Sequence, residues 1–184
     1  MKAIEKAASY VGQRETGRNR SKLIDMLNKF VGNPLGSPYC AAGVSYCMHH
    51  QNTPGQGFPK TGSSQEFKRW AIKKKRFFID PNELKTCKGA LVGFTNEGDE
   101  GHGHIAFVEG RLTDPSGKVV GIRTIEFNSD LGGDREGEGV YRLERHMIAP
   151  GKWQVENAQG ELVGKVRQLW FVRLDGVLGG EWWT

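Results

Sequence analysis

The sequence lacks the features of several common protein classes. Its 184 residues contain three cysteines, an odd number at spacings that match no zinc-binding pattern, which argues against a disulfide scaffold or a structural zinc site. No apolar run is long enough to cross a membrane, and residues 1–15 lack the apolar core of a secretory signal peptide. Internal repeats and long low-complexity linkers are also missing. We therefore expect one domain over residues 1–184, made in the cytoplasm without a signal peptide and not stably inserted in a membrane.

The composition that is present fits a folded, mildly basic domain. An apolar fraction of 37% is enough for one hydrophobic core, and 26 glycines favour a fold rich in loops and strands. The formal net charge is +5, so nucleic acid, an anionic membrane and an anionic polymer such as the bacterial cell wall are all chemically acceptable partners. The densest basic run, residues 68–76, is predicted to be the solvated face of a helix rather than a binding patch. Charge alone does not choose among these partners.

Hydrophobic periodicity divides the chain into a helical first half and a strand-rich second half. Apolar residues at helical spacing predict helices at residues 2–12, 21–32, 40–50 and 63–75. Runs rich in β-branched and aromatic residues predict strands at residues 90–94, 104–110, 119–128, 139–145 and 166–174. Helices followed by an antiparallel sheet form an α+β arrangement.

Cys40 has the sequence surroundings of an activated nucleophile. A free thiol has a pKa of about 8.5, so most of it is protonated at neutral pH. Pro38 precedes Cys40 and small residues follow it, which places the thiol at the first turn of a helix. There, free backbone N–H groups and the helix dipole stabilise an anion, and the Cys40 N–H would face a developing oxyanion. The alternative is a buried, unreactive thiol, and Cys47 is predicted to be one.

A catalytic thiol also needs a base. His49 and His50 lie near the far end of the predicted Cys40 helix, about 15 Å from the thiol, and are poor candidates. His104 opens the predicted strand at residues 104–110, where it would be held rigidly and could still face a cleft. We therefore predict His104 as the base.

The base in turn needs a group that orients its ring. Glu126 and Asn128 lie two residues apart on the next predicted strand, so they would share one face. If this strand pairs with the His104 strand through the turn at residues 113–118, either side chain could hold the imidazole. Each residue taken singly has an ordinary structural explanation, but the ordered set of cysteine, histidine and polar pair predicts a catalytic site.

These motifs resemble those of the CHAP family, the cysteine, histidine-dependent amidohydrolases and peptidases that cut bacterial peptidoglycan. The matching stretches are YCAAGV at 39–44, GHIAFVEG at 103–110, IEFN at 125–128 and GVYRLER at 139–145. The chain departs from the family at Tyr39, where Trp is common, at Gly43, where Phe is frequent, and at Phe127, where Gly is common. Gly43 and Phe127 could compensate for one another in packing.

The resemblance implies a papain-like α+β fold of the NlpC and CHAP type, with N-terminal helices packed on a C-terminal antiparallel β-sheet. The site residues that it implies are the nucleophile Cys40, the base His104 and the orienting residues Glu126 and Asn128. Tyr39, Trp70 and Phe127 are candidate residues of the substrate cleft, and the alternative is that all three belong to the core. No metal or other cofactor is expected, because the acidic residues between 130 and 138 are predicted to form a solvated loop rather than a cation site.

The implied activity is peptidoglycan hydrolysis by an N-acetylmuramoyl-L-alanine amidase or a stem-peptide endopeptidase. The expected enzyme is a monomer whose partner is bacterial peptidoglycan and not nucleic acid. It would reach the periplasm or wall as a phage endolysin released through a holin, as a secreted toxin with an immunity protein, or as a phage-tail cargo domain. Two alternatives stay open: a papain-like protease, deamidase or transglutaminase acting on proteins, and a non-catalytic basic module that binds the wall or nucleic acid.

Overall fold

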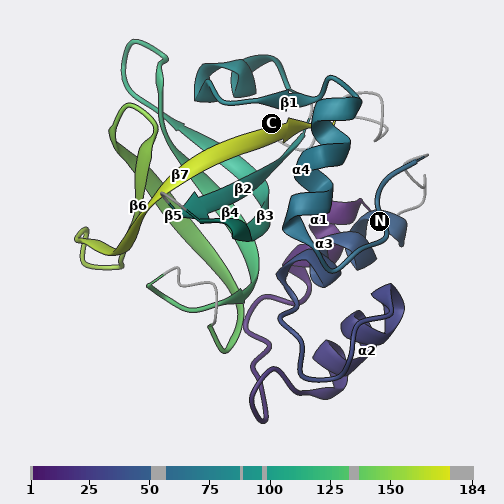
Figure 1. The fold of residues 1–184 in the computed structure, drawn as a ribbon. Helices are drawn as coiled ribbons and strands as arrows, with labels where there is room; N and C mark the ends of the chain where they lie inside the picture. Colours follow the sequence, from purple (N-terminus) through teal and green to yellow (C-terminus); the bar gives the residue numbers. More distant parts are fainter. Residues whose placement is uncertain (1, 51–56, 88, 97–98, 133–136, 175–184) are drawn as a thin grey trace.

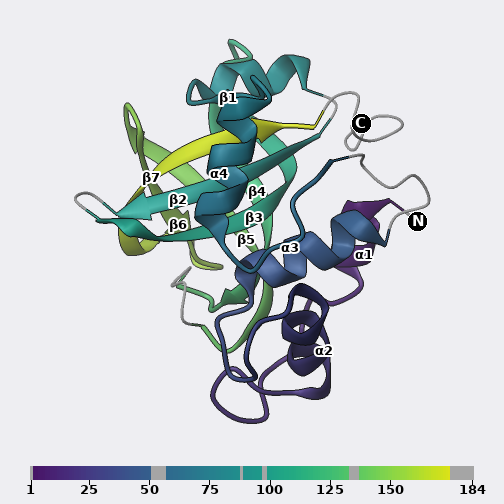
Figure 2. The same cartoon turned by 45° about the vertical axis from the view of Figure 1, so that its right-hand side comes forward.

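The computed structural model describes residues 2–50, 57–87, 89–96, 99–132 and 137–174. A closed barrel of antiparallel strands forms one side of the molecule, and short helices lie along the other (Figure 1 and Figure 2). The strands are β1 (Phe77–Phe78), β2 (Ala90–Asn96), β3 (Asp99–Thr113), β4 (Val119–Ser129), β5 (Gly139–Ala149), β6 (Lys152–Glu156) and β7 (Leu162–Arg173). The helices are α1 (Ala3–Ala8), α2 (Lys22–Val31), α3 (Cys40–His49), α4 (Ser64–Lys73) and the 3-10 helix η1 (Pro81–Thr86).

Local capping explains where the helices begin and end. The Ser21 hydroxyl accepts a hydrogen bond from the N–H of Ile24 at 3.2 Å and caps α2, which ends at Gly32 in the left-handed conformation at φ 80°. Ser63 caps α4 in the same way, through the N–H of Glu66. The four predicted helices are confirmed at these positions, although the first ends earlier than predicted.

The barrel closes because β6 pairs with strands on both of its sides. The order around the barrel is β7, β2, β3, β4, β5 and β6, and β6 then pairs with β7 again. β2 lies along one edge of β7, whereas the short β1 and β6 pair with successive parts of its other edge. The predicted papain-like α+β fold, with helices packed on an antiparallel sheet, is therefore wrong. The prediction contained neither β1 nor β6, and without β6 the sheet has no strand to close it.

Strand alternation separates two hydrophobic cores. One set of alternating side chains fills the barrel, with Val92, Ala106, Ile122, Trp153 and Phe171 contributed by five different strands. The opposite faces of β2, β3, β4 and β7 pack outward against the apolar faces of the helices, which forms the larger core. Because His104 and Glu126 keep the alternation of the interior set, they enter the barrel and not the helix interface.

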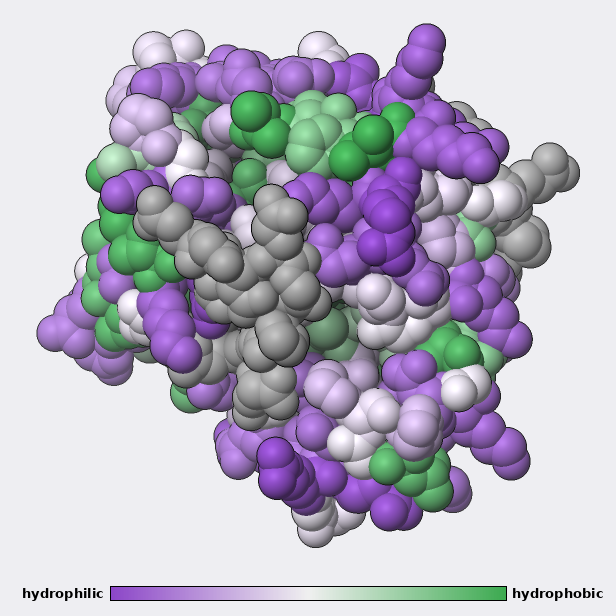
Figure 3. All heavy atoms as spheres, in the orientation of Figure 1, coloured by the Kyte–Doolittle hydropathy of each residue, from purple (hydrophilic) through white to green (hydrophobic). Residues whose placement is uncertain are grey.

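The outer surface is mainly polar on the face that Figure 3 shows, where hydrophobic side chains gather along the upper edge, over β1 and η1. In the part of the chain that the structure describes, no helix is long and apolar enough to span a membrane.

Candidate functional site

Cys40 is the first residue of α3, and its side chain is almost completely enclosed. It is 7% exposed, and Tyr39 before it is the N-cap residue of the helix. The backbone N–H groups of Ala41 in the first turn of α3 and of Ile105 on β3 donate hydrogen bonds to the sulfur. Two peptide dipoles from different elements therefore favour a negative charge on the thiol.

His104 projects from β3 into the barrel, where Glu126 of β4 holds it. Its Nε2 lies 3.1 Å from Oε2 of Glu126, and the two residues are 4% and 0% exposed. The residue before it, Gly103, allows α4 to begin directly against β3, because a Cβ there would lie only 2.8 Å from the Ser64 hydroxyl. The imidazole is thus fixed by the carboxylate on one side and by a close helix–strand contact beside it.

The imidazole of His104 also interacts with the Cys40 thiol. Nδ1 is buried and makes no hydrogen bond of standard geometry, but the thiol of Cys40 is close enough to interact with the ring both electrostatically and as a hydrogen-bonding group. Contacts between a nucleophile and its base often tighten only when substrate binds. The structure therefore brings Cys40, His104 and Glu126 together, with Nε2 of the imidazole facing Glu126 and the thiol interacting with the same ring.

Glu126 is held by more donors than its interaction with histidine requires. Arg145 of β5 donates from Nε to Oε1 at 2.8 Å and from Nη2 to Oε2 at 2.9 Å, and it is only 1% exposed. The Thr124 hydroxyl donates to Oε1 at 2.6 Å, and the Ser129 hydroxyl lies 3.4 Å from Oε2. A buried carboxylate with this many donors is stable in its charged form.

The pKa values of the three groups are shifted in directions that favour an ion pair. Burial raises the pKa of the Cys40 thiol, but His104 and the two backbone N–H groups outweigh burial, and the net pKa is lowered. Burial lowers the pKa of His104, but Cys40 and Glu126 outweigh it and raise the pKa to about 9. Burial raises the pKa of Glu126, yet Arg145 and His104 together lower it well below the ordinary value. The lowered pKa of Cys40 and the raised pKa of His104 both favour a thiolate beside an imidazolium.

Asn128 is placed differently from Glu126, although both are fully buried. The register of β4 with β5 shifts between Phe127 and Ser129, so Asn128 is the extra residue of a β-bulge, and its φ is +58°. The bulge interrupts the two-residue alternation that predicted a shared face. As a result, the Ser129 hydroxyl lies within hydrogen-bonding distance of the Glu126 carboxylate, and this carboxylate accepts the hydrogen bond from His104.

The three residues predicted to contact substrate differ in how far their side chains are exposed. Tyr39 and Phe127 are both 0% exposed, so neither offers surface to a substrate, and they act as packing residues. The Phe127 ring fills the space next to Gly43, where a Cβ would come within 2.4 Å of Cγ of the ring. Trp70 is half-buried, with its indole N–H donating to the Gly57 carbonyl at 2.6 Å and its ring edge-to-face with Phe58.

Arg145 and the hydroxyl residues Thr124 and Ser129 complete the cluster, and none of the three was predicted from the sequence. Arg145 did carry a signal, because it continues the alternation of Tyr141 and Leu143 on the buried face of β5, where a hydrophobic residue is the usual choice. An arginine at such a position requires a buried acidic partner. Glu126, at an inward position of the neighbouring strand, is that partner.

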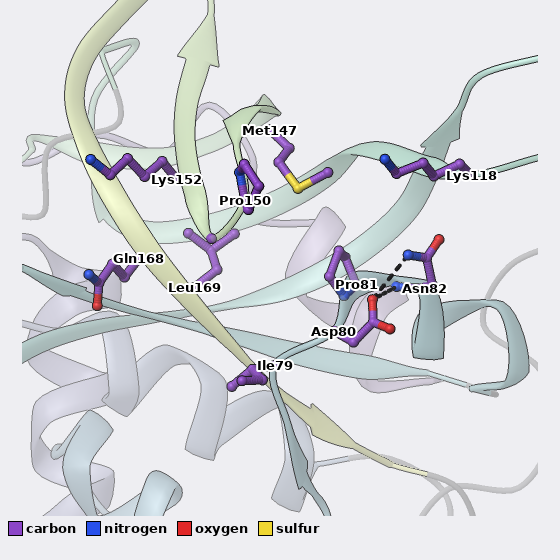
Figure 4. A pocket seen from close by; sticks show the side chains of 11 residues that line it. Ile79, Asp80, Pro81, Asn82, Lys118, Met147, Pro150, Lys152, Gln168 and Leu169 are labelled. Carbon is purple, nitrogen blue, oxygen red and sulfur yellow. Dashed lines mark hydrogen bonds between the residues drawn. The ribbon is translucent and has the colours of Figure 1, made fainter.

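A separate cavity of about 540 Å³ lies near the turn between β3 and β4 and the turn between β5 and β6 (Figure 4). Met147 and Leu169 are among its apolar lining, and Lys118 and Lys152 extend beside them. Leu169 is paired with Phe94, which in turn is paired with His104, so the cavity approaches the same row of the barrel. Cys40, His104, Glu126 and Arg145 are not among its lining residues.

Within the described ranges, no group of three or more His, Cys, Asp or Glu side chains is arranged to hold a metal ion. Asp134 and Glu136 of the acidic loop lie outside these ranges, and Glu138 forms an ion pair with Arg14 at 2.6 Å. Comparison of the chain with protein-family models and with curated protein sequences finds no match to either.

Proposed function

We propose that this protein is a cysteine amidohydrolase that cleaves an amide bond in bacterial peptidoglycan. The observation that carries the proposal is the buried grouping of Cys40, His104 and Glu126, in which one imidazole contacts the carboxylate through Nε2 and also interacts with the thiol. A thiol at a helix start, a histidine beside it and a carboxylate behind the histidine are the three parts that nucleophilic acyl transfer needs.

In the first half of the reaction, the Cys40 thiolate attacks the amide carbonyl carbon and forms an S–C bond. The carbonyl oxygen becomes an oxyanion near the first turn of α3, where N–H groups without helical partners stabilise it. The C–N bond then breaks as the His104 imidazolium gives its Nδ1 proton to the leaving amine. The products of this half are a thioester on Cys40, a free amine and a neutral imidazole.

In the second half, the neutral His104 takes a proton from water, and the resulting hydroxide attacks the thioester. The C–S bond breaks, the product leaves as a carboxylic acid, and the thiolate–imidazolium pair is restored. Glu126 stays ionised throughout, because it accepts hydrogen bonds from Arg145 as well as from His104. Its role is to orient the ring and to stabilise the imidazolium.

The substrate class rests on two further features. The CHAP-like motifs at residues 39–44, 103–110 and 125–128 include the cysteine, the histidine and the carboxylate of the cluster. The net charge of +5 also suits an anionic wall polymer. The proposal rests on these residues and not on the fold expected from the resemblance. Release through a holin, injection by a secretion system and delivery on a phage tail each remain compatible with it.

The test is to digest purified peptidoglycan with the protein and to analyse the soluble fragments by mass spectrometry. New amine and carboxyl ends are expected, and their positions identify the scissile bond. Cys40→Ala should abolish their release, whereas Cys47→Ala is a matched control in the same helix and should retain it, because Cys47 is also a buried free thiol. Absence of new ends with a folded wild-type protein would overturn the assignment to peptidoglycan, and a protein substrate would then be sought.

A further inference from the structure

We propose that Arg145 is a positioning residue for the Cys40–His104 pair, because its charge keeps the buried cluster neutral when Cys40 is a thiolate and His104 is an imidazolium. This inference rests on the proposed nucleophilic role of Cys40. Arg145 is connected to the thiol through Glu126 and His104.

The contacts form a continuous chain across four elements. The Arg145 guanidinium of β5 binds both oxygens of Glu126 on β4, Glu126 binds Nε2 of His104 on β3, and His104 interacts with Cys40 on α3. Phe94 of β2 borders the chain on one side, with its ring 4.3 Å from the guanidinium carbon and 5.3 Å from the imidazole centroid. The guanidinium is thus stacked on an aromatic ring and fixed by a two-point hydrogen bond.

A count of charges explains what this chain does. The thiolate, imidazolium, carboxylate and guanidinium sum to zero, and all four residues are at most 7% exposed. Without the guanidinium, the other three groups carry one net negative charge in a poorly solvated site, which favours the uptake of a proton. The thiolate is the more basic of the two anions, since the pKa of a free thiol is about 8.5 and the pKa of a free glutamate side chain is about 4.3. Loss of the Arg145 charge therefore protonates the nucleophile.

Structural stabilisation alone is a weaker explanation of this arginine. Replacing a buried ion pair by apolar residues of similar size is often neutral or stabilising, so a barrel interior has no general need for one. The chain also contains an exposed counterpart for comparison. Arg142, on the same strand, makes a two-point contact with Glu109 at 2.5 and 2.7 Å, and its side chain is 46% exposed.

The experiment measures the rate of Cys40 alkylation by iodoacetamide from pH 5 to pH 10, resolved by mass spectrometry for each cysteine. Arg145→Met should raise the midpoint of the Cys40 profile and reduce the rate at pH 6 at least tenfold, which corresponds to about one pKa unit. Arg145→Lys keeps the charge and should stay within about threefold of wild type. Arg142→Met removes the exposed contact and should leave the profile unchanged.

A double variant keeps the test decisive if Arg145→Met does not fold. Glu126→Gln with Arg145→Met removes one charge of each sign, so the remaining pair is neutral and Cys40 should again titrate well below an ordinary thiol. A folded Arg145→Met protein with the wild-type profile would overturn the inference, as would a double variant whose Cys40 titrates like a free thiol. Alkylation needs no wall substrate, so a failure here is distinct from a failure of peptidoglycan cleavage.

Discussion

Gly43 of α3 is the position where the structure makes the sharpest prediction about a single methyl group. An ideal Cβ at residue 43 would lie 2.4, 2.5 and 2.7 Å from three ring atoms of Phe127, distances that require one of the two elements to move. The Phe127 ring has little room to give way, because it is fully buried and packs edge-to-face on Tyr10. Gly43→Ala therefore forces either the helix or the ring out of its place.

Two opposing effects decide the size of the change. Alanine in a helix interior is favoured over glycine by about 1 kcal/mol. Overpacking a close contact costs about 1–3 kcal/mol, and a contact this short belongs at the upper end of that range. We expect Gly43→Ala to lower the free energy of unfolding by about 2 kcal/mol, the difference between about 3 and about 1 kcal/mol.

Urea denaturation followed by tryptophan fluorescence measures this change, and a double-mutant cycle identifies its cause. Phe127→Ala removes all three ring atoms in the way, so Gly43→Ala should no longer be destabilising in that background, with a coupling of about 3 kcal/mol, the whole overpacking cost. A Gly43→Ala protein more stable than wild type would show that helix propensity outweighs the steric contact. Additive single effects would show that the ring of Phe127 is not what excludes a side chain at residue 43.

Three further predictions concern the site, the barrel and a helix cap. Because the pKa of His104 is raised to about 9, hydrolytic activity should fall as the pH rises through about 9, where the imidazole loses the proton that it gives to the leaving amine; an unchanged rate up to pH 10 would contradict this role. Trp153→Ala in β6 should lower the free energy of unfolding by about 3–5 kcal/mol, because the indole fills the barrel. A loss under 1 kcal/mol in urea denaturation would argue against a packed interior. Ser21→Ala should cost about 1 kcal/mol by removing the cap of α2, whereas Ser37→Ala, at a half-buried serine in a loop, serves as its control.

Local features of the chain were predictable where the partners are close in sequence. The beginning and end of α2 follow from Ser21 and Gly32, because a cap bonds to a backbone group three or four residues away. Cys40 was predicted at a helix start from the nearby Pro38 and the small residues that follow it, and α3 does begin there. His104 was singled out because it opens a predicted strand, and Glu126 because a polar pair inside an apolar strand is unusual.

The choice between Glu126 and Asn128 could not be made in this way. Strand alternation predicts a shared face for both residues, but a bulge at Asn128 shifts the register, and a bulge depends on how β4 pairs with β5. The role of Arg145 also depends on that strand pairing. Arg145 lies 19 residues from Glu126 in sequence, but the pairing brings it within hydrogen-bonding distance of Glu126.

The amino-acid sequence by itself determined the helix positions, the main strands and the order of cysteine, histidine and carboxylate along the chain. Only the tertiary structure decided that the sheet closes into a barrel, because β6 is a strand of five residues whose pairing with both β5 and β7 is set by distant parts of the chain. It also decided the charge state of the site. The pKa of a thiol depends on burial and on neighbouring charges, and the fold brings those charges from β3, β4 and β5 to the first turn of α3.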